Sequence, residues 1–494
     1  MGENAAFIIV LIYTLSIGAI MVFSIGQAVL VYQYLKGKKA KIGESQNPRK
    51  GYFPLVTLQL PVYNELYVVE RLIDACCRLD YPIDKLEIQV LDDSTDETKE
   101  IIAKKVKEYQ AKGVDISQVL RPNRVGYKAG ALEYGLKQCK GEFIAIFDAD
   151  FVPEPDFLMN TISQFSEDNI GMVQTRWEHL NLDYSLLTKV QGFGLDAHFT
   201  VEQAGRNFAG LYMNFNGTAG VWRKSCISDA GGWQHDTLTE DLDLSYRAQL
   251  KGWNFKYLEQ FATPAELPAE MSAVKSQQFR WTKGAVETAK KVLRNVWKAD
   301  IALKLKVFST FHLLNSYVFI FIFLTGVLSV PLLVIKNQYP VYQTYFLFSS
   351  FFLLSFVVMI AFYMVSLSQR IQSKSGTFKR FLFLFPLFMS VSMGMAFHNS
   401  KAVIEGLRGK KSPFIRTPKF NVVAMSDKFS QNKYLSRKIE WGTVVETLLA
   451  FYYLGGIAIA VYFVDYGLLP FHLMLFLGFG IISYFSISHA RLRN

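Results

Sequence analysis

Five long stretches without a charged side chain constrain this 494-residue chain more than any other feature of its sequence. Each is close to, or longer than, the roughly 20 residues that an apolar helix needs to cross a bilayer. Apolar residues also make up 51% of the chain, which predicts a multi-pass membrane protein with five crossings. The stretches run from Ala5 to Leu35, Val307 to Ile335, Tyr345 to Leu367, Thr447 to Val464 and Leu468 to Ile487.

The basic residues beside these stretches predict their orientation. The first stretch lacks a basic segment before it and is longer than a signal-peptide core, so we interpret it as an uncleaved anchor. Lysines follow it at once, beginning at Lys36, which predicts an N-terminus outside and a cytoplasmic segment after it. Alternation then places the remaining basic flanks in the cytoplasm: Lys304 and Lys306, Arg370 to Arg380, Arg437 and Lys438, and Arg491 and Arg493.

A sixth apolar segment, Phe381 to Phe397, does not fit this alternation. Basic residues flank both ends, Lys379 and Arg380 before it and Lys401 after it, so both ends favour the same side. We expect a helix in the cytoplasmic interface, broken or bent near Pro386; a sixth crossing is the alternative. Basic flanks facing anionic lipid account for most of the formal charge of +11, and nothing in the sequence suggests nucleic acid.

Four cysteines lie in the predicted cytoplasmic region without the spacing of metal ligands. We therefore expect reduced thiols that serve only in packing. Few cysteines and a compact chain favour a bacterial inner membrane, with a Golgi protein of the same topology as the alternative. The cysteines are Cys76, Cys77, Cys139 and Cys226.

Residues 51–300 alternate apolar β-type runs with amphipathic helical patterns. Strands are expected at LVTLQL (55–60), LEIQVLDD (86–93) and FIAIFDAD (143–150), and helices over Val68 to Leu79 and Glu97 to Gln110. This alternation predicts an α/β domain whose parallel sheet is covered on both faces. Ligands of such sheets bind at the carboxyl ends of the strands, where this chain places its acidic motifs.

The run FIAIFDAD ends in two carboxylates one residue apart. In an extended segment Asp148 and Asp150 point the same way and can face one divalent cation. Their oxygen atoms suit Mg2+ or Mn2+, which would neutralise a diphosphate. A solvated strand end is the alternative for so short a pattern. Three further motifs favour the metal interpretation: VLDDSTD (90–96), LTED (238–241) and QQFRW (277–281).

Two motifs at strand ends are candidates for binding a nucleotide. Pro61 and Glu65 of PVYNE (61–65) could border the base, although a plain turn with Asn64 as helix N-cap explains the motif as well. Asp92 and Asp93 end the next strand, where one carboxylate could accept a hydrogen bond from a base or ribose. Residues just after them can cap a helix, so one of the two aspartates could be local scaffolding.

Arg124 and Lys128 of RVGYKAGAL (124–132) offer cations near the same edge. Gly126 and Gly130 would let the backbone approach a phosphate, and the helix that begins there adds its positive end. A charged helix start on a solvated face is the alternative.

Two later motifs are candidates for binding and activating a sugar acceptor. Asn216, Gly217 and Thr218, in the turn-rich run NFNGTAGVWR (214–223), could hold sugar hydroxyls. Asp241 falls on the first turn of a predicted helix, where a carboxylate can act as general base at neutral pH. Thr239 as N-cap, followed by acids that complement the helix dipole, is the alternative.

Taken together and in order, these motifs resemble those of the membrane-embedded family-2 glycosyltransferases. The resemblance is closer to the cellulose-synthase-like A and C groups, the mannan, glucomannan and glucan-backbone synthases. It extends from before Leu55 to about Lys419. The motifs are PVYNE, QVLDDSTDET, NRVGYKAGAL, FDADFVPEPDFL, VQTRWEHLN, FNGTAGVWR, TEDLDLSYRAQLKGW and QQFRW.

The resemblance implies a glycosyltransferase-A-type domain, Rossmann-like with a mixed sheet, inserted in a helical transmembrane region. Asp92 or Asp93 would hold the nucleotide, and the DxD carboxylates the metal and diphosphate. Asp241, beside Glu240 in the TED triplet, would activate the acceptor hydroxyl for inverting attack. Arg280 would stabilise the leaving diphosphate.

The same resemblance assigns the remaining site residues. Gln277 and Trp281 of QxxRW would bind the acceptor sugar; without the family, Trp281 would be interpreted as an anchor at the membrane interface. FIRTPK (414–419) is similar to the gating loop of related synthases, in which Thr417 and Lys419 approach the diphosphate and Phe414 packs beneath it. A basic linker near the membrane is the alternative interpretation of that loop.

The implied activity is that of an inverting, metal-dependent, processive enzyme. It would extend β-1,4-mannan, glucomannan or glucan from GDP-mannose or UDP-glucose on the cytoplasmic face. Single transfer to a lipid, as in ceramide glucosyltransferases, and a non-catalytic membrane scaffold are the alternatives. The expected parts are an anchor and basic linker (1–50), the catalytic domain (51–300), two membrane helices (301–370), an interfacial helix with gating loop (371–440) and two membrane helices (441–494).

Overall fold

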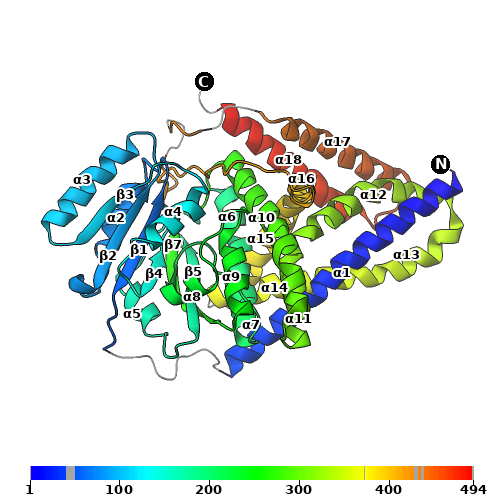
Figure 1. Cartoon of the computed structure of the whole chain (residues 1–494). Coiled ribbons are helices and arrows are strands. Elements are labelled where there is room, and N and C mark those ends of the chain that lie inside the picture. Colours follow the sequence, from blue (N-terminus) through cyan, green and yellow to red (C-terminus); the bar gives the residue numbers. More distant parts are fainter. Residues whose placement is uncertain (1, 41–50, 372, 428–431, 436–438, 492–494) are drawn as a thin grey trace.

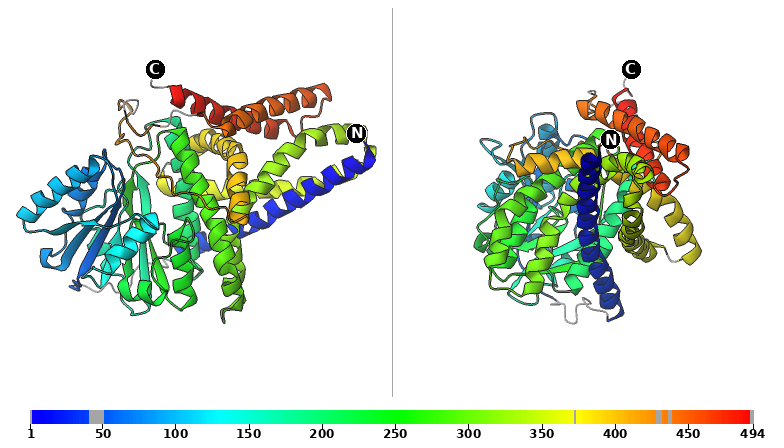
Figure 2. Two further views of the ribbon diagram at one scale, coloured as in Figure 1. Left: turned by 45° about the horizontal axis from the view of Figure 1, so that its top comes forward. Right: turned by 90° about the vertical axis from the view of Figure 1, so that its right-hand side faces the viewer.

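A computed structural model describes residues 2–40, 51–371, 373–427, 432–435 and 439–491 (Figure 1). A sheet covered by helices forms one end of the molecule, and long helices extend away from it (Figure 2). Part of the predicted basic linker, residues 41–50, lies outside the described residues, as do the flanking cations Arg437, Lys438 and Arg493.

The sheet has seven strands in the order β3-β2-β1-β4-β6-β5-β7. Strands β1, β2 and β4 are almost wholly buried, as expected for strands covered on both faces, although β1 and β2 also carry polar residues. The strands are β1 (Val56–Val62), β2 (Leu86–Asp92), β3 (Asp115–Leu120), β4 (Phe143–Ile146), β5 (Ile170–His179), β6 (Gly220–Arg223) and β7 (Asn254–Ala265).

The prediction of a wholly parallel sheet is wrong, and the mixed sheet implied by the family resemblance is confirmed. Strands β1 to β4 pair in parallel, but β6 is antiparallel to both β4 and β5. Strand β6 lies between β4 and β5, which run the same way, and runs against both. In the parallel half, Val62 pairs with Asp92 and Gln59 with Ile146, so the strands that precede PVYNE, DDST and FDAD end at one edge.

Two apolar cores lie on opposite faces of the sheet. The first packs the sheet against α2 (Val69–Cys76), α3 (Thr98–Ala111) and α5 (Phe157–Ile162). The second packs the other face against α4 (Tyr127–Leu136), α6 (Leu186–Ala197), α8 (Lys224–Asp229) and α9 (Glu240–Leu250). This second core continues without interruption into α1 (Glu3–Lys39), α14 (Leu354–Arg370) and α15 (Lys374–Gly394).

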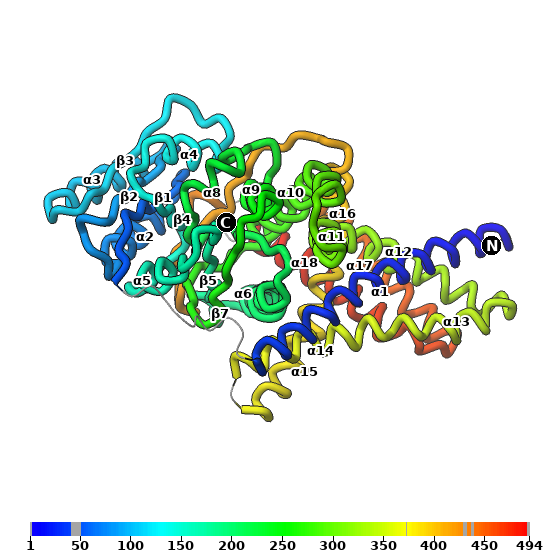
Figure 3. Tube along the Cα trace, turned by 60° about the horizontal axis from the view of Figure 1, so that its bottom comes forward, coloured from blue at the N-terminus to red at the C-terminus, as the bar shows by residue number. Residues whose placement is uncertain are grey.

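Five helical segments are long and apolar enough to cross a membrane, which agrees with the five predicted crossings. The span expected from Val307 begins later, because residues 303–313 form a separate helix. The segments are α1, Asn315–Gln338 (containing α12, Val318–Gln338), Pro340–Arg370 (containing α13, Gln343–Ser349, and α14), α17 (Trp441–Tyr462) and α18 (Leu469–Arg491). Figure 3 shows α1 running beside α12 and α14.

The remaining helices join the sheet to the spans. The longest, α10, starts beside the sheet and carries the QxxRW motif toward the membrane helices (Figure 1). These helices are α7 (Gln203–Phe208), α10 (Met271–Lys298), α11 (Leu303–Leu313) and α16 (Ala396–Leu407).

The sixth apolar segment forms α15 and α16, which meet at an angle of 45°. The predicted break near Pro386 is wrong, because α15 continues through Pro386 and the bend falls at Met395. Gly394, which ends α15, has the backbone of Gly478 against it, so the bend lies where α15 packs closely on α18. Counted as one span, the bent pair would raise the number of candidate crossings to six.

The predicted thiols are free: Cys76, Cys139 and Cys226 are buried, and Cys77 is half-buried. Burial raises the pKa of the Cys77 thiol to about 12. These residues therefore stay protonated at neutral pH and serve in packing.

We predict that Gly478→Ala destabilises the protein. A Cβ at this position would lie 1.9 Å from the carbonyl oxygen of Ser390 in α15, so the two helices would have to separate. Overpacking of this kind costs about 1–3 kcal/mol, which thermal unfolding of the purified protein would register as a lower Tm. Gly480→Ala on the same helix is the matched control, because a Cβ there has no atom within 4 Å. Equal Tm values for the two variants would contradict the described packing.

Candidate active site

A cavity of about 180 Å³ opens where the parallel strands end. Its walls come from segments far apart in the sequence: the loops after β1, β2 and β4, the start of α4, the loop before β6, the start of α9, the middle of α10 and residues 414–419. The lining residues include Pro61, Glu65, Asp93, Arg124, Lys128, Asp148, Asp150, Asn216, Gly217, Glu240, Asp241, Gln277, Arg280, Trp281, Thr417 and Lys419.

Two predicted site residues, Asp92 and Thr218, do not line the cavity. The Asp92 carboxylate is buried, where it accepts hydrogen bonds from the Ser94 amide and the Gln118 side chain, both at 2.8 Å. The buried Thr218 hydroxyl accepts a hydrogen bond from the backbone amide of Asp148 at 2.9 Å. Both residues therefore shape the loops that carry the cavity residues.

Asp93 and Arg124 occupy one end of the cavity. Arg121, which sequence reasoning missed, donates two hydrogen bonds to the Asp93 carboxylate, at 2.6 and 2.5 Å. The Arg124 guanidinium lies 3.2 Å from the centre of the Tyr63 ring. Stacked planar groups beside a fixed carboxylate form a wall against which a flat nucleobase can pack.

The glycines expected to let phosphate approach, Gly126 and Gly130, do not line the cavity, and steric contacts explain both. A Cβ at Gly130 would lie 2.1 Å from the carbonyl oxygen of Val125, and one at Gly126 would lie 2.9 Å from the ring of His235. Gly126 also has a φ of +73°. Both glycines are therefore required by the tight turn that leads into α4.

Each carboxylate of the DxD motif pairs with a lysine. Lys128 Nζ lies 2.5 Å from Asp148 Oδ1 and donates to the carbonyl oxygen of Gly217 at 2.9 Å. Lys419 Nζ lies 2.6 Å from Asp150 Oδ2. The two carboxylates thus attract cations from two different segments, the start of α4 and residues 414–419.

Among the described residues, no group of three or more His, Cys, Asp or Glu side chains is arranged to hold a metal ion. Asp148 and Asp150 nevertheless fit Mg2+ or Mn2+, because such ions bind nucleotide substrates through one or two carboxylates, water and the phosphates themselves. The lysines now beside the carboxylates would then be released toward the phosphate oxygens.

Asp241 faces the same cavity from the first turn of α9. Burial and the negative charge of Glu240 raise the pKa of Asp241 to about 7. Thr239 makes no side-chain cap for this helix, so the simple capping interpretation of the TED triplet fails. Gly217 has a φ of +81°, and a Cβ there would come within 3.0 Å of Asp241 Oδ2. Both facts explain why this position requires glycine.

Asn216 borders the cavity next to Gly217. Its Oδ1 lies 2.9 Å from the side-chain amide of Asn214 and 3.1 Å from His198 Nε2, and the other ring nitrogen of His198 contacts Glu202. The side-chain amide nitrogen of Asn216, Nδ2, is buried and has no hydrogen-bond partner in the described part of the chain. His198 was missed because no local pattern connects it to a loop 18 residues later.

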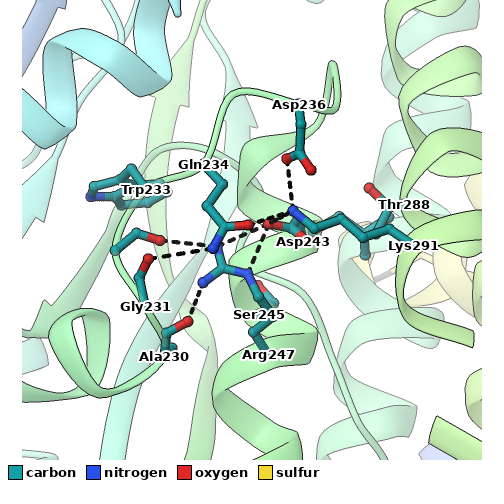
Figure 4. Close-up of polar contacts among 12 residues, drawn as sticks. Ala230, Gly231, Trp233, Gln234, Asp236, Asp243, Ser245, Arg247, Thr288 and Lys291 are labelled. Atoms are coloured by element: carbon teal, nitrogen blue, oxygen red, sulfur yellow. Dashed lines mark hydrogen bonds and ion pairs between the residues drawn. The ribbon is translucent and has the colours of Figure 1, made fainter. Parts of the chain in front are cut away.

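A polar network holds the start of α9 against α10 (Figure 4). Lys291 Nζ donates to Gln234 at 2.6 Å, Asp236 at 2.7 Å and the buried Asp243 at 3.0 Å. Arg247 also donates to Asp243, at 2.9 Å. Because Asp243 lies two residues beyond the TED triplet in the same helix, this network fixes Asp241 relative to the helix that carries QxxRW.

Arg280 of QxxRW connects α10 to residues 414–427, which we call the strap. Its Nη2 donates to the Thr417 hydroxyl at 2.8 Å, and its guanidinium lies 4.5 Å from the centre of the Phe414 ring. Gln277 and Trp281 line the cavity from the same helix, half-buried. The structure thus brings the predicted gating loop and the QxxRW motif together.

Further contacts of the strap were not foreseen from the sequence. Arg416 forms an ion pair with Glu65 at 2.7 Å, and the buried Glu266 accepts the amide of Phe420 at 2.9 Å. Beyond the strap, Tyr434 donates to Asp96. Arg416 lies inside the FIRTPK motif, but its partner Glu65 is more than three hundred residues away in the sequence. No local pattern could therefore predict this ion pair.

We predict that Lys419→Gln and Arg416→Gln each loosen the strap. Hydrogen bonds to charged groups contribute about 1.5–3 kcal/mol, so amide hydrogen exchange over residues 414–424 should become about tenfold faster or more. Lys411→Gln is the control, since this exposed lysine has no ion pair in the described part of the chain. Exchange as slow as in the wild type would contradict the ion pairs.

Two family models match this chain. One, described as "Glycosyltransferase like family 2", matches residues 54–284, and the other, described as "Cellulose synthase", matches residues 222–373. The two matches overlap across β6, α9 and the QxxRW motif, and together they cover the sheet domain and the first helices after it.

Curated relatives from plants match over longer segments. Glucomannan 4-beta-mannosyltransferase 1 of Oryza sativa subsp. japonica is 37% identical over 405 residues, which cover 78% of this chain and 73% of the relative. Probable glucomannan 4-beta-mannosyltransferase 4 of the same species is 45% identical over 275 residues, covering 54% of this chain. In that second comparison the match spans about half of the relative, 49% of its length.

A solved structure shares the fold. The mannosyltransferase PcManGT from Pyrobaculum calidifontis, in complex with GDP-Man and Mn2+, aligns with a TM-score of 0.54 at 18% identity. The alignment covers 79% of this chain and 100% of that protein.

Proposed function

This chain belongs to the family-2 glycosyltransferases, among the cellulose-synthase-like relatives that include glucomannan 4-beta-mannosyltransferases, and on that premise we propose its reaction. It is an inverting, metal-dependent and processive glycosyltransferase that extends a β-1,4-linked hexose polymer from a nucleotide sugar. The names of the relatives favour mannose as the transferred sugar, with GDP-mannose as donor.

One observation carries this proposal. A single cavity collects the paired carboxylates Asp148 and Asp150, the candidate base Asp241, and Arg280 from a helix that continues toward the membrane spans. A carboxylate pair for the diphosphate, a base for the acceptor and a cation for the leaving group are the three parts that sugar transfer needs. A non-catalytic scaffold would not require them to converge.

The donor end of the cavity binds the nucleotide diphosphate in this proposal. The nucleobase packs against Tyr63 and Arg124 beside Asp93. A divalent cation bound by Asp148 and Asp150 would neutralise the diphosphate when present. Lys128 and Lys419 exchange their carboxylate partners for phosphate oxygens, and Arg280 stabilises the charge that develops on the leaving diphosphate.

Asp241 acts on the acceptor. It accepts the proton from the acceptor hydroxyl as that oxygen bonds to the anomeric carbon, while the bond from this carbon to the diphosphate breaks on the opposite side. The configuration at the carbon is inverted, and the nucleoside diphosphate leaves with the bonding electrons. Asn216, Gln277 and Trp281 hold the acceptor sugar, and Thr417 keeps the strap over the site.

The membrane arrangement belongs to the same proposal. The catalytic domain faces the cytoplasm, the N-terminus lies outside, and the product passes between the membrane helices to the far side. The plant origin of the curated relatives gives no support to a bacterial inner membrane.

We predict that Asp241→Asn lowers the rate of sugar transfer by about a hundredfold or more. Loss of a general base lowers the rate by about 10²–10⁴-fold. The assay supplies purified protein in lipid with Mg2+ or Mn2+ and GDP-mannose, UDP-glucose or both, and follows nucleotide release and product size. Asp229→Asn, a surface carboxylate on α8, is the control with unchanged rate.

Other outcomes of this assay would overturn parts of the proposal. A glycolipid as sole product would indicate single transfer to a lipid. Undiminished release by Asp241→Asn would remove its role as base, and no release with any donor would favour the scaffold.

The raised pKa of Asp241 predicts a pH dependence. A general base works only when deprotonated, so kcat/KM should fall about tenfold for each pH unit below about 7 and level off above it. Initial rates of the wild-type enzyme between about pH 5 and pH 9 measure this profile. A limb near pH 4, the range of an exposed carboxyl, would contradict the assignment.

A further inference from the structure

A second cavity, of about 170 Å³, lies between α6, α14 and α15, apart from the active site. Five apolar side chains line it, among them Phe193 and Leu384, together with four charged ones. The charged side chains are Lys189, Asp196, Arg370 and Arg380.

The cavity carries an excess of positive charge. The carboxylate of Asp196 is already engaged by His179 at 3.0 Å and Arg370 at 3.2 Å. Arg370 also pairs at 2.6 Å with Glu178, a carboxylate that has Arg176 as a second partner at 2.8 Å.

Lys189 and Arg380 are not neutralised in this way. The ion pair of Lys189 is with Asp183, at 3.5 Å, and that carboxylate is 76% exposed and therefore screened. Arg380 has no ion pair or hydrogen bond within the described residues. The cavity therefore offers two cations for a ligand that brings negative charge.

The cavity lies where a membrane span ends. Arg370 is the last residue of α14 and of the candidate span Pro340–Arg370. Beside Arg380 on α15, the large side chains of Phe378, Leu382 and Phe383 are 55–60% exposed, as expected for residues that face lipid. Figure 3 shows α14 and α15 side by side at the end of the bundle next to the sheet domain.

We propose that this cavity binds an acidic phospholipid. The headgroup phosphate lies between Lys189 and Arg380, and an acyl chain follows the exposed apolar side chains of α15. An apolar lining with charges at its mouth matches a lipid, whose phosphate and chains are joined in one molecule. A zwitterionic headgroup would add an ammonium group to a site that already has two cations in excess.

The test measures lipid selectivity of the full chain reconstituted in phosphatidylcholine bilayers. Spin-labelled phosphatidylglycerol and phosphatidylcholine are compared by the fraction that the protein immobilises. We expect the wild type to prefer phosphatidylglycerol over phosphatidylcholine. Each cation removed should lower this preference about fivefold, so the double variant Lys189→Gln, Arg380→Gln should lose it. Arg380→Gln alone should lower the lipid preference by half as much as the double variant, measured on a logarithmic scale. Arg380 is exposed, so this substitution should not disturb folding.

Lys379→Gln is the matched control. This exposed lysine neighbours Arg380 on α15 but does not line the cavity, so its loss should leave the preference unchanged. An equal loss of lipid preference in Lys379→Gln and Arg380→Gln would mean that general surface charge attracts the lipid. That result would overturn the proposal. An unchanged preference in the double variant would overturn it as well.

A soluble anion is the remaining competitor. Glycerol phosphate at millimolar concentration should not displace the labelled lipid; displacement would assign the cavity to a free phosphate instead. No nucleotide sugar is present in any arm, so the result does not depend on whether the proposed glycosyltransferase reaction is correct.

Discussion

Repulsion among carboxylates at one edge of the sheet is the constraint on which the rest of the active site depends. Six acidic side chains line the cavity, and five basic ones lie among them. Two of the five, Arg416 and Lys419, belong to the strap, so the six carboxyl groups would share only three lining cations if the strap withdrew. In the proposed reaction, closure of the strap and binding of a cation with the donor would be alternative ways to satisfy the same charges.

The convergence of the motifs could be predicted from the sequence because it follows from sheet topology. Parallel strands end at one edge, so the motifs after β1, β2 and β4 had to meet, and the structure brings Glu65, Asp93 and Asp148 to one cavity. The membrane spans were equally predictable, since a long uncharged helix has few other environments.

The features that sequence reasoning missed are of two kinds. Some depend on contacts between distant segments, and others on strands too short for their sequence to indicate whether they run parallel or antiparallel to their neighbours. The four buried residues of β6 look the same in a parallel or an antiparallel strand, and β3 is half-exposed and weakly patterned. The pairing of Arg416 with Glu65 and of His198 with Asn216 is decided by packing. The sequence also left open which of Asp92 and Asp93 faces the cavity. The contacts of Asp92 with Ser94 and Gln118, which only the structure shows, decide this in favour of Asp93.

The apolar core shared by the sheet, α1, α14 and α15 has a mechanical consequence. Side chains of the sheet domain and of the spans interdigitate in one continuous body, so a rocking motion between them would open that core and expose it to water. If the chain extends a polymer as proposed, advance by one sugar then cannot be driven by a stroke of the whole domain. The moving parts must be small: the strap, the side chains around the acceptor, and the polymer itself sliding past a stationary frame.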